Sequence, residues 1–224
     1  MDWSWIQRNA QDILVMAGQH IVWSVAAVLA GFVLALPAGY LVYRTGRGSG
    51  AWLAVLGLLY AIPSVALFVV MPLILGTGIL DPLNVIGALA VYCFALLVRN
   101  VRDGFAGVDP TVRQSATAMG FGTVRRVVRV ELPLAMPVIY AGLRVATVST
   151  ISLVSVGAVI GNGALGQLFD LGFRSGFATP ILAGILAILV LALVADGLLL
   201  VLQRVTLPWF GLGVRGERQR AGAV

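Results

Sequence analysis

Residues 179–202 have the sequence TPILAGILAILVLALVADGLLLVL, an apolar run in which Asp196 is the only charged residue. A transmembrane helix needs about 20 mostly apolar residues, so this run predicts a membrane-spanning helix. The whole chain has the same character: 60% of its 224 residues are hydrophobic and 11% are charged, with a mean hydropathy of +1.00. Because a soluble domain carries roughly 25% charged residues, we predict an integral membrane protein.

Outward from this run, four more stretches are free of charge and long enough to cross a membrane. They are residues 21–43, 48–80, 82–98 and 145–169. We therefore predict an all-α integral membrane fold in which residues 1–224 form a single transmembrane domain. Its five spans are expected near 21–43, 52–71, 82–98, 138–160 and 179–202. No duplicated block is visible, so any pseudo-symmetry would need a second subunit.

The segment 48–80 leaves an alternative open, because it could hold two short spans broken at Pro63. All 15 basic residues are arginines, against 9 acidic residues, and their distribution favours one span. With a single span there, 12 of the 15 arginines lie on one side, which the positive-inside rule makes cytoplasmic. The N-terminus is then expected outside and the C-terminus inside.

Composition excludes several kinds of site. A single cysteine, Cys93, excludes an internal disulfide and a cysteine-rich metal site. A single histidine, His20, argues against zinc binding or His-based catalysis, and we predict no catalytic or metal-binding residue. The N-terminus lacks the basic region of a signal peptide, and its residues Trp3, Trp5 and Ile6 are typical of an interfacial anchor.

The longest polar segment lies between the third and fourth spans, from Arg99 to about Leu134. Asp109 is a good N-cap with Pro110 at the first helical position, so a short helix is expected up to Gly120. A second helix is expected to begin after Thr123 as its N-cap and to end at Pro133. It would place valines on one face and arginines on the other.

Two interpretations of this loop, about residues 109–133, compete. The helices could lie on anionic lipid headgroups, with their arginines bound to phosphate. Alternatively, the small residues of the first helix allow the close backbone approach that docking on a cytoplasmic partner requires. Those small residues are Ser115, Ala116, Ala118 and Gly120.

The loop resembles the EAA loop, E-A-A-x3-G-x9-I-x-L-P, of permease subunits of binding-protein-dependent ABC importers. Gln114, Ser115 and Ala116 take its first three positions, and Gly120, Val130, Leu132 and Pro133 follow at the same spacing. The stretches AIPSVALFVVMPLILG at 61–76 and IGNGALGQLF at 160–169 are similar to the osmoprotectant branch, which imports glycine betaine, carnitine or choline. The resemblance covers about residues 20–212.

This resemblance implies a MetI-like type I importer fold, located in a bacterial plasma (inner) membrane, and favours docking. The first helix would dock on a cytoplasmic ABC ATPase dimer, which would bind the ATP and Mg²⁺, so this chain is expected to hold no cofactor and to be no enzyme. A second permease subunit and an extracytoplasmic substrate-binding protein are also expected. The candidate ATPase-coupling residues are Gln114, Ser115, Ala116, Gly120, Arg125, Val130, Leu132 and Pro133. Because Gln114 replaces a glutamate, it brings no charge to the contact.

Two G-x-G-x-x-G motifs occur, at 161–166 and 211–216. Neither is predicted to follow a strand, which a dinucleotide site requires, so we predict no nucleotide binding at either. The first is expected to allow tight backbone packing at the outer end of the fourth span. By resemblance, Gly161, Asn162 and Gly163 are candidates for an outer gate or a contact with the binding protein.

Two ionisable residues, Arg144 and Asp196, are expected inside the membrane at similar depth from the same side, about 10 Å and 9 Å at 1.5 Å per residue. Opposite charges at matching depth predict an ion pair between the fourth and fifth spans. A structural role is favoured over a direct role in substrate passage.

The pathway candidates surround Pro63, which should kink the second span and leave free carbonyls for Ser64 or water. Tyr60, Ser64 and Trp23 could contact a quaternary ammonium through cation–π attraction or weak polar contacts, although aromatics in such helices more often serve packing.

Other function classes are less well supported by the sequence. An ion-coupled secondary transporter, the alternative, would need several intramembrane carboxylates or inverted repeats. A membrane-embedded enzyme would need a catalytic constellation within the spans. Nucleic-acid binding lacks an aromatic platform, and the chain has no P-loop and no lysine.

Overall fold

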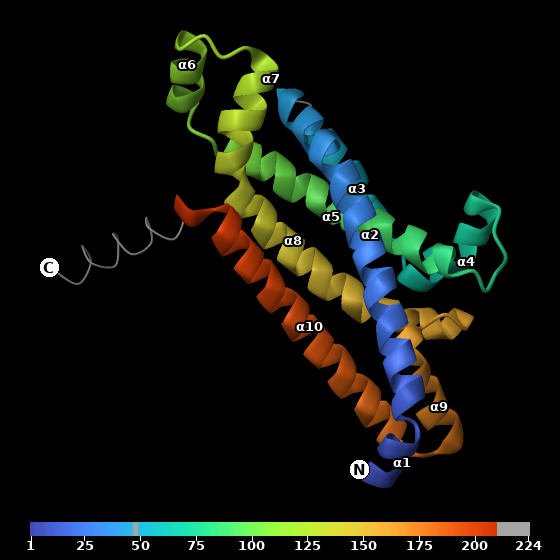
Figure 1. Cartoon of the computed structure of the whole chain (residues 1–224). Helices are drawn as coiled ribbons and strands as arrows, with labels where there is room; N and C mark the ends of the chain where they lie inside the picture. Colours follow the sequence, from blue (N-terminus) through green and yellow to red (C-terminus); the bar gives the residue numbers. More distant parts are fainter. Residues whose placement is uncertain (47–48, 210–224) are drawn as a thin grey trace, which may run out of the picture.

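The computed structural model describes residues 1–46 and 49–209, and their regular structure is entirely helical (Figure 1). The α-helices are α1 (Trp3–Arg8), α2 (Ala10–Arg44), α3 (Ser49–Ala61), α4 (Ser64–Leu75), α5 (Pro82–Ala106), α6 (Pro110–Ala118), α7 (Thr123–Arg126), α8 (Leu132–Val154), α9 (Gln167–Ser175) and α10 (Ala178–Thr206). A π-helical segment, η2 (Val127–Glu131), joins α7 to α8, and two 3₁₀ segments, η3 (Ser155–Ile160) and η4 (Ala164–Gly166), follow α8.

Within the described residues, four helical segments are long and apolar enough to cross a membrane. They are Ala10–Arg44, Pro82–Ala106, Thr123–Ile160 and Ala178–Thr206. The pair α3 and α4 makes a fifth if it is counted as one span. The predicted all-α membrane fold is therefore confirmed, whereas the direction in which the helices cross stays a prediction.

The second predicted span is broken rather than kinked. Pro63 has the non-helical angles φ −59° and ψ 131°, and α3 and α4 meet there at 97°. With 13 and 12 residues, each helix is about 20 Å long, which is less than the roughly 30 Å of bilayer hydrocarbon. The expectation of a kinked but continuous helix was therefore wrong, and the pair is a broken span or a re-entrant hairpin.

Small residues bring α2 and α5 into direct backbone contact. Ala27, Gly31, Ala35 and Gly39 recur every fourth residue of α2, and all four are buried. A Cβ atom on Gly31 would lie 2.7 Å from the Cβ of Cys93 on α5, and one on Gly39 would lie 2.7 Å from a γ-carbon of Val101. This spacing is the small-xxx-small pattern by which membrane helices pack closely.

Helix α5 makes a similarly close contact with α8. A Cβ on Gly104 would lie 2.9 Å from the carbonyl oxygen of Ala135, and one on Gly142 would lie 2.6 Å from the Cβ of Asn100. Helix α5 thus packs against both α2 and α8 at glycine-containing crossings. In Figure 1, α8 and α10 lie on one side of α2 and α4 lies on the other.

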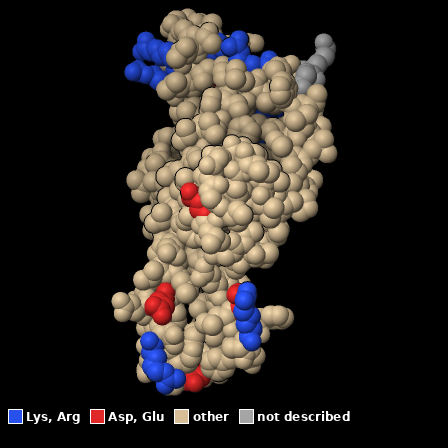
Figure 2. Space-filling view, turned by 90° about the vertical axis from the view of Figure 1, so that its right-hand side faces the viewer, with Lys and Arg blue, Asp and Glu red and all other residues tan. Residues whose placement is uncertain are grey.

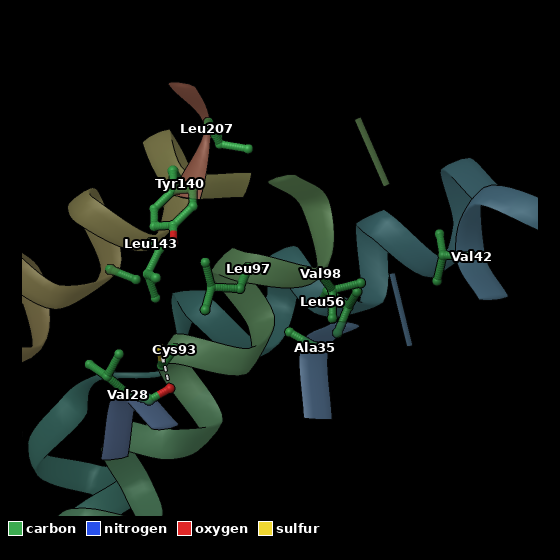
Figure 3. Packing of buried hydrophobic residues seen from close by; sticks show 11 residues of the cluster. Val28, Ala35, Val42, Leu56, Cys93, Leu97, Val98, Tyr140, Leu143 and Leu207 are labelled. Carbon is green, nitrogen blue, oxygen red and sulfur yellow. Dashed lines mark hydrogen bonds between the residues drawn. The ribbon is translucent and has the colours of Figure 1, made fainter. Parts of the chain in front are cut away.

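The main buried cluster is built from α2, α3, α5 and α8, with one residue from the segment after α10 (Figure 3). Its members are Val28, Ala35, Val42, Leu56, Cys93, Leu97, Val98, Tyr140, Leu143, Ala146 and Leu207. A second cluster, which includes Trp23, Phe68 and Val154, joins α4 to the same helices. A third lies where α5 and α8 approach the α6–α7 segment: Val101, Phe105, Val108, Ala135 and Ile139.

Charge is concentrated at the two ends of the molecule. In Figure 2 blue arginine side chains lie at both ends of this face, with red acidic groups beside those at the lower end, and the broad middle is almost free of charge. The end with α6 and α7 is called the loop end below. Helix α2 runs from the opposite end, where the N-terminus lies, to the loop end (Figure 1).

Candidate functional site

Helix α6 begins as the sequence predicts. Asp109 is its N-cap, and the carboxylate accepts hydrogen bonds from the backbone N–H of Thr111 at 2.7 Å and from the Thr111 hydroxyl. Hydrogen bonding from the Thr111 hydroxyl, followed by that from its N–H, lowers the pKa of Asp109 below its ordinary value. Pro110 occupies the first turn, where its missing N–H has no consequence.

Gly120 reverses the chain after α6. Its φ of +81° lies in the left-handed region, which glycine adopts without a Cβ penalty. The N–H of Gly120 donates to the carbonyl of Thr117 at 3.0 Å, and that of Phe121 donates to Ala116 at 3.1 Å. These bonds use carbonyls at the helix end that would otherwise lack partners. Helices α6 and α7 therefore form a compact hairpin, called the α6 hairpin below (residues 109–131).

The second helix of the hairpin differs from the prediction at both ends. Its N-cap is Gly122, one residue before the expected Thr123, and the helix does not end at Pro133. Instead the N–H of Leu132 donates to Val127, five residues earlier. This π-helical register accommodates Pro133, which has no N–H, in the first turn of α8, so the hairpin runs directly into a membrane helix.

The structure divides the predicted coupling residues into two groups. Gln114, Ser115, Gly120 and Arg125 are exposed, whereas Ala116 is buried and Val130, Leu132 and Pro133 are half-buried. The guanidinium of Arg125 lies over the ring of Phe121, 4.9 Å from its centroid. Only the first group is available to a partner, and the coupling role of both groups stays a prediction.

The predicted valine face of the second helix is only partly correct. Val127 packs against the third buried cluster, but Val124 and Val128 are 77% and 56% exposed. Those two side chains are turned away from the protein, so the three valines do not share one buried face.

A charged cluster at the base of the hairpin was not anticipated from the sequence. The carboxylate of Glu131 is buried and accepts a hydrogen bond from the Nε of Arg126 at 2.8 Å, with the Nε of Arg113 3.6 Å away. Beside it, a hollow of about 460 Å³ is lined by Arg113, Gln114, Thr117, Ala118 and Arg126. The available indication was a glutamate that closely follows three arginines, Arg125, Arg126 and Arg129.

The structure brings Arg144 of α8 and Asp196 of α10 together. The Nε and one terminal nitrogen of Arg144 each donate to a different carboxylate oxygen of Asp196 at 2.7 Å, the bidentate geometry that arginine favours with carboxylates. The two side chains are 33% and 28% exposed. The pair joins α8 to α10, and its functional role stays a prediction.

The pathway candidates lie at the break between α3 and α4. The carbonyl of Ile62, beside Pro63, accepts a hydrogen bond from the hydroxyl of Tyr92 on α5. The donor at this break is therefore Tyr92, whereas the sequence suggests Ser64 or water. The ring of Tyr60 is 45% exposed and packs edge-on against that of Tyr92, with centroids 5.7 Å apart. Trp23, by contrast, belongs to a buried cluster.

The glycines after α8 allow a tightly packed turn. The N–H of Asn162 donates to Gly157 at 2.9 Å, and a Cβ on Gly163 would lie 2.6 Å from the Cα of Ala158. Of the three predicted gate residues, Gly161 is exposed, whereas Asn162 and Gly163 are buried. Their role at a gate stays a prediction, and the second glycine motif, at 211–216, lies outside the described residues.

At the opposite end, the N-terminal segment packs on α10. The N–H of Asp2 donates to the hydroxyl of Thr179 at 3.0 Å, and the ring of Trp5 meets that of Phe177 edge-on at 6.1 Å. Trp3 is 68% exposed. Among the described residues, no group of three His, Cys, Asp or Glu side chains is placed to hold a metal ion.

Comparison with known proteins agrees with this architecture. The family model described as "Binding-protein-dependent transport system inner membrane component" matches residues 13–206. The osmoprotectant import permease protein OsmW of Salmonella typhimurium is 37% identical over 209 residues, covering 89% of this chain and 94% of that protein. The choline transport system permease protein OpuBB of Bacillus subtilis is 31% identical over 203 residues, covering 91% and 92%.

Solved structures share the fold. A chain of the MetNI methionine ABC transporter, in an inward-facing conformation, superposes with a TM-score of 0.79 at 21% identity, covering 92% of this chain and 99% of that one. An amino acid ABC transporter gives a TM-score of 0.75 at 17% identity, covering 91% and 98%. Because the family model spans most of the sequence and the relatives align over nearly their whole length, the chain belongs to the inner-membrane components of binding-protein-dependent transport systems, as an ABC transporter permease.

Proposed function

We propose that this chain is the membrane-spanning subunit of an ATP-driven importer for a compatible solute such as glycine betaine, choline or carnitine. It forms half of the translocation pathway, and its α6 hairpin docks on a cytoplasmic ATPase. The observation that supports this best is the hairpin itself, in which a capped helix presents Gln114 and Ser115 outward while Ala116 is buried.

The composition of α6 favours docking over binding to lipid headgroups. A helix that lies on a membrane needs large apolar side chains on one face and free basic residues on the other. In α6 the exposed residues are mostly polar or small, such as Gln114, Ser115 and Ala118, and the exposed valines Val124 and Val128 lie on the other arm of the hairpin. Two of the arginines, Arg113 and Arg126, are directed to Glu131 inside the hairpin, so they are less available to phosphate.

The solute class is inferred from the relatives and from chemistry. One relative is named as a choline permease and another as a glycine betaine/carnitine/choline permease, OpuCB of Bacillus subtilis, 29% identical over 216 residues and covering 96% of this chain and 97% of that protein. These solutes share a quaternary ammonium group, which aromatic rings attract through cation–π interactions. The exposed ring of Tyr60, beside Pro63 and Ser64, is therefore our candidate for contact with the solute.

The complete importer would contain two permease subunits, two ATPases and a separate extracytoplasmic binding protein. ATP and Mg²⁺ would bind to the ATPase, and this chain would contribute only to the pathway and to coupling. The second permease would be another copy or a paralogue.

The proposal is tested by reconstitution into proteoliposomes with a partner ABC ATPase and a substrate-binding protein. Uptake of radiolabelled glycine betaine, choline, carnitine and proline is measured with ATP on the side of the ATPase. We expect uptake that requires both ATP and the binding protein and that persists when ion gradients are dissipated. Uptake driven by a proton or sodium gradient without the ATPase would refute the proposal in favour of a secondary transporter.

Docking is tested separately by a bulky substitution on the exposed face of α6. Ser115→Trp should reduce copurification of the ATPase with this chain, because the indole would prevent close approach. The matched control, Ser175→Trp, changes an exposed serine on α9 at the opposite end and should leave copurification unchanged. Equal copurification of the two variants would exclude this face of α6 as the docking surface.

A further inference from the structure

A buried carboxylate lies where the α6 hairpin joins the membrane helices. Glu131 is 1% exposed and is the last residue of the π segment before α8. Its two partners are Arg126, with a hydrogen bond of 2.8 Å, and Arg113, whose Nε is 3.6 Å from the second carboxylate oxygen. Arg113, Arg126 and Glu131 are called the Glu131 cluster below.

Arg113 connects α6 to the ends of two membrane helices. One terminal nitrogen donates to the carbonyl oxygens of Phe105 at 2.9 Å and Val108 at 2.6 Å, at the C-terminal end of α5. Carbonyls at the C-terminal end of a helix have few helical partners and carry the negative end of the helix dipole, so a cation binds them well. The same guanidinium lies 5.3 Å from the ring centroid of Tyr43, near the end of α2.

Arg126 connects the two arms of the hairpin. While its Nε binds Glu131, one terminal nitrogen donates to the hydroxyl of Thr117 on α6 at 2.9 Å. Helix α6 is therefore attached to Glu131 at two points, one turn apart, through Arg113 directly and through Thr117 and Arg126 indirectly. Glu131 in turn is continuous with α8.

These contacts restrict how α6 can move. Separating Glu131 from its arginines would leave a buried charge without a partner, which is costly in a low-dielectric environment. A displacement of α6 therefore costs least if Glu131 and the end of α5 move with it. The contact between Arg113 and Glu131 is the longer of the two, and the Nε of Arg113 has no hydrogen bond, so this contact has room to shorten.

We propose that the Glu131 cluster transmits the movement of α6 to α5 and α8, with Glu131 and Arg113 as positioning residues. This inference rests on the proposed docking of α6 on the ATPase. The loop thus has Gln114 on its outer face, whereas the buried carboxylate of Glu131 lies on the inner face and joins the hairpin to the membrane helices.

The test uses the reconstituted complex of this chain, the ATPase and the binding protein. Three quantities are measured with saturating glycine betaine: copurification of the ATPase, the rate of ATP hydrolysis, and solute uptake per ATP hydrolysed. The variants are Arg113→Met, Glu131→Gln and the control Arg129→Met. Arg129 is an exposed arginine in the same π segment, so the control removes an equal charge without altering the cluster. Arg113→Met leaves Glu131 paired with Arg126, so it should fold even if Glu131→Gln does not.

We expect Arg113→Met and Glu131→Gln to retain the ATPase and to hydrolyse ATP, while uptake per ATP falls at least about fivefold, the lower end of typical coupling between linked sites. Arg129→Met should behave as the unaltered chain. Unchanged uptake per ATP in Arg113→Met would overturn the inference. So would loss of the ATPase from both cluster variants, because the cluster would then shape the docking surface. Failure of the unaltered chain to retain the ATPase would instead refute the proposed function.

Discussion

The close contact between α2 and α5 predicts that one methyl group has opposite effects at two glycines of α2. At Gly31 a new Cβ would lie 2.7 Å from the Cβ of Cys93 and 2.9 Å from both the carbonyl oxygen of Ala90 and the amide nitrogen of Phe94. Gly18 is on the same helix, and a Cβ added there would have no atom within 4 Å apart from the neighbouring backbone of α2. Gly31→Ala and Gly18→Ala are therefore a matched pair.

The magnitude follows from two opposing contributions. Replacing glycine by alanine in a helix interior stabilises the folded chain by about 1 kcal/mol at either position. At Gly31 the new contacts are roughly 1 Å shorter than the optimal carbon–carbon separation of about 3.5–4.0 Å, and overpacking of this kind costs about 1–3 kcal/mol. Gly18→Ala should thus stabilise the chain by up to about 1 kcal/mol, and Gly31→Ala should destabilise it by up to about 2 kcal/mol.

The assay is thermal unfolding of each purified variant in one detergent at one scan rate, followed by tryptophan fluorescence. For a chain of this size, 1 kcal/mol corresponds to a change in Tm of about 2–4 °C. We expect Tm to rise for Gly18→Ala and to fall for Gly31→Ala, with a similar fall for Gly39→Ala, whose new Cβ would lie 2.5 Å from the Cβ of Val101. An equal rise in Tm for all three variants would refute the close packing of α2 on α5.

Three other predictions concern single interactions. Neutralising Arg144 alone or Asp196 alone should lower Tm and purified yield as much as neutralising both, because either single change leaves one charge unpaired among apolar helices; additive losses would refute the pair. Tyr92→Phe removes the hydroxyl donor to the Ile62 carbonyl and should lower stability by about 1–3 kcal/mol, measured as Tm; an unchanged Tm would show that water replaces the donor. For Asp109 the lowered pKa means that the cap contributes fully above the ordinary pKa of 3.8 and is lost only as the pH falls through the lower folded value. The Tm difference between the unaltered chain and Asp109→Ala should therefore be constant from neutral pH to about pH 4, and a decline already at pH 5 would contradict the shift.

Local features of the α6 hairpin were predictable from the sequence because they depend on neighbouring residues. The cap at Asp109, the proline after it and the glycine turn at 120 all involve contacts over a few residues. The π segment was not predictable, because nothing in VVRVE marks a change of hydrogen-bond register. The end assigned to Pro133 was wrong for that reason.

The α2–α5 contact could have been anticipated in part. The spacing of Ala27, Gly31, Ala35 and Gly39 is visible in the sequence, but it does not identify the helix that packs against it. Likewise, Pro63 indicates where the helix breaks but not the angle at the break. The 97° between α3 and α4 depends on how each helix packs against α5.

The sequence alone determined the class of protein and the family, and it predicted the segments that enter the membrane. Transfer of a segment into hydrocarbon depends on its own composition, and the loop motif depends on residue types at fixed spacing. The pairing of Arg144 with Asp196, 52 positions apart, was expected from their matching depth. Only the tertiary structure decided the partners of Glu131, which meet it when α6 folds back on the ends of α5 and α8. Such pairs depend on where helices cross, and the crossings are set by close packing at glycines on different helices.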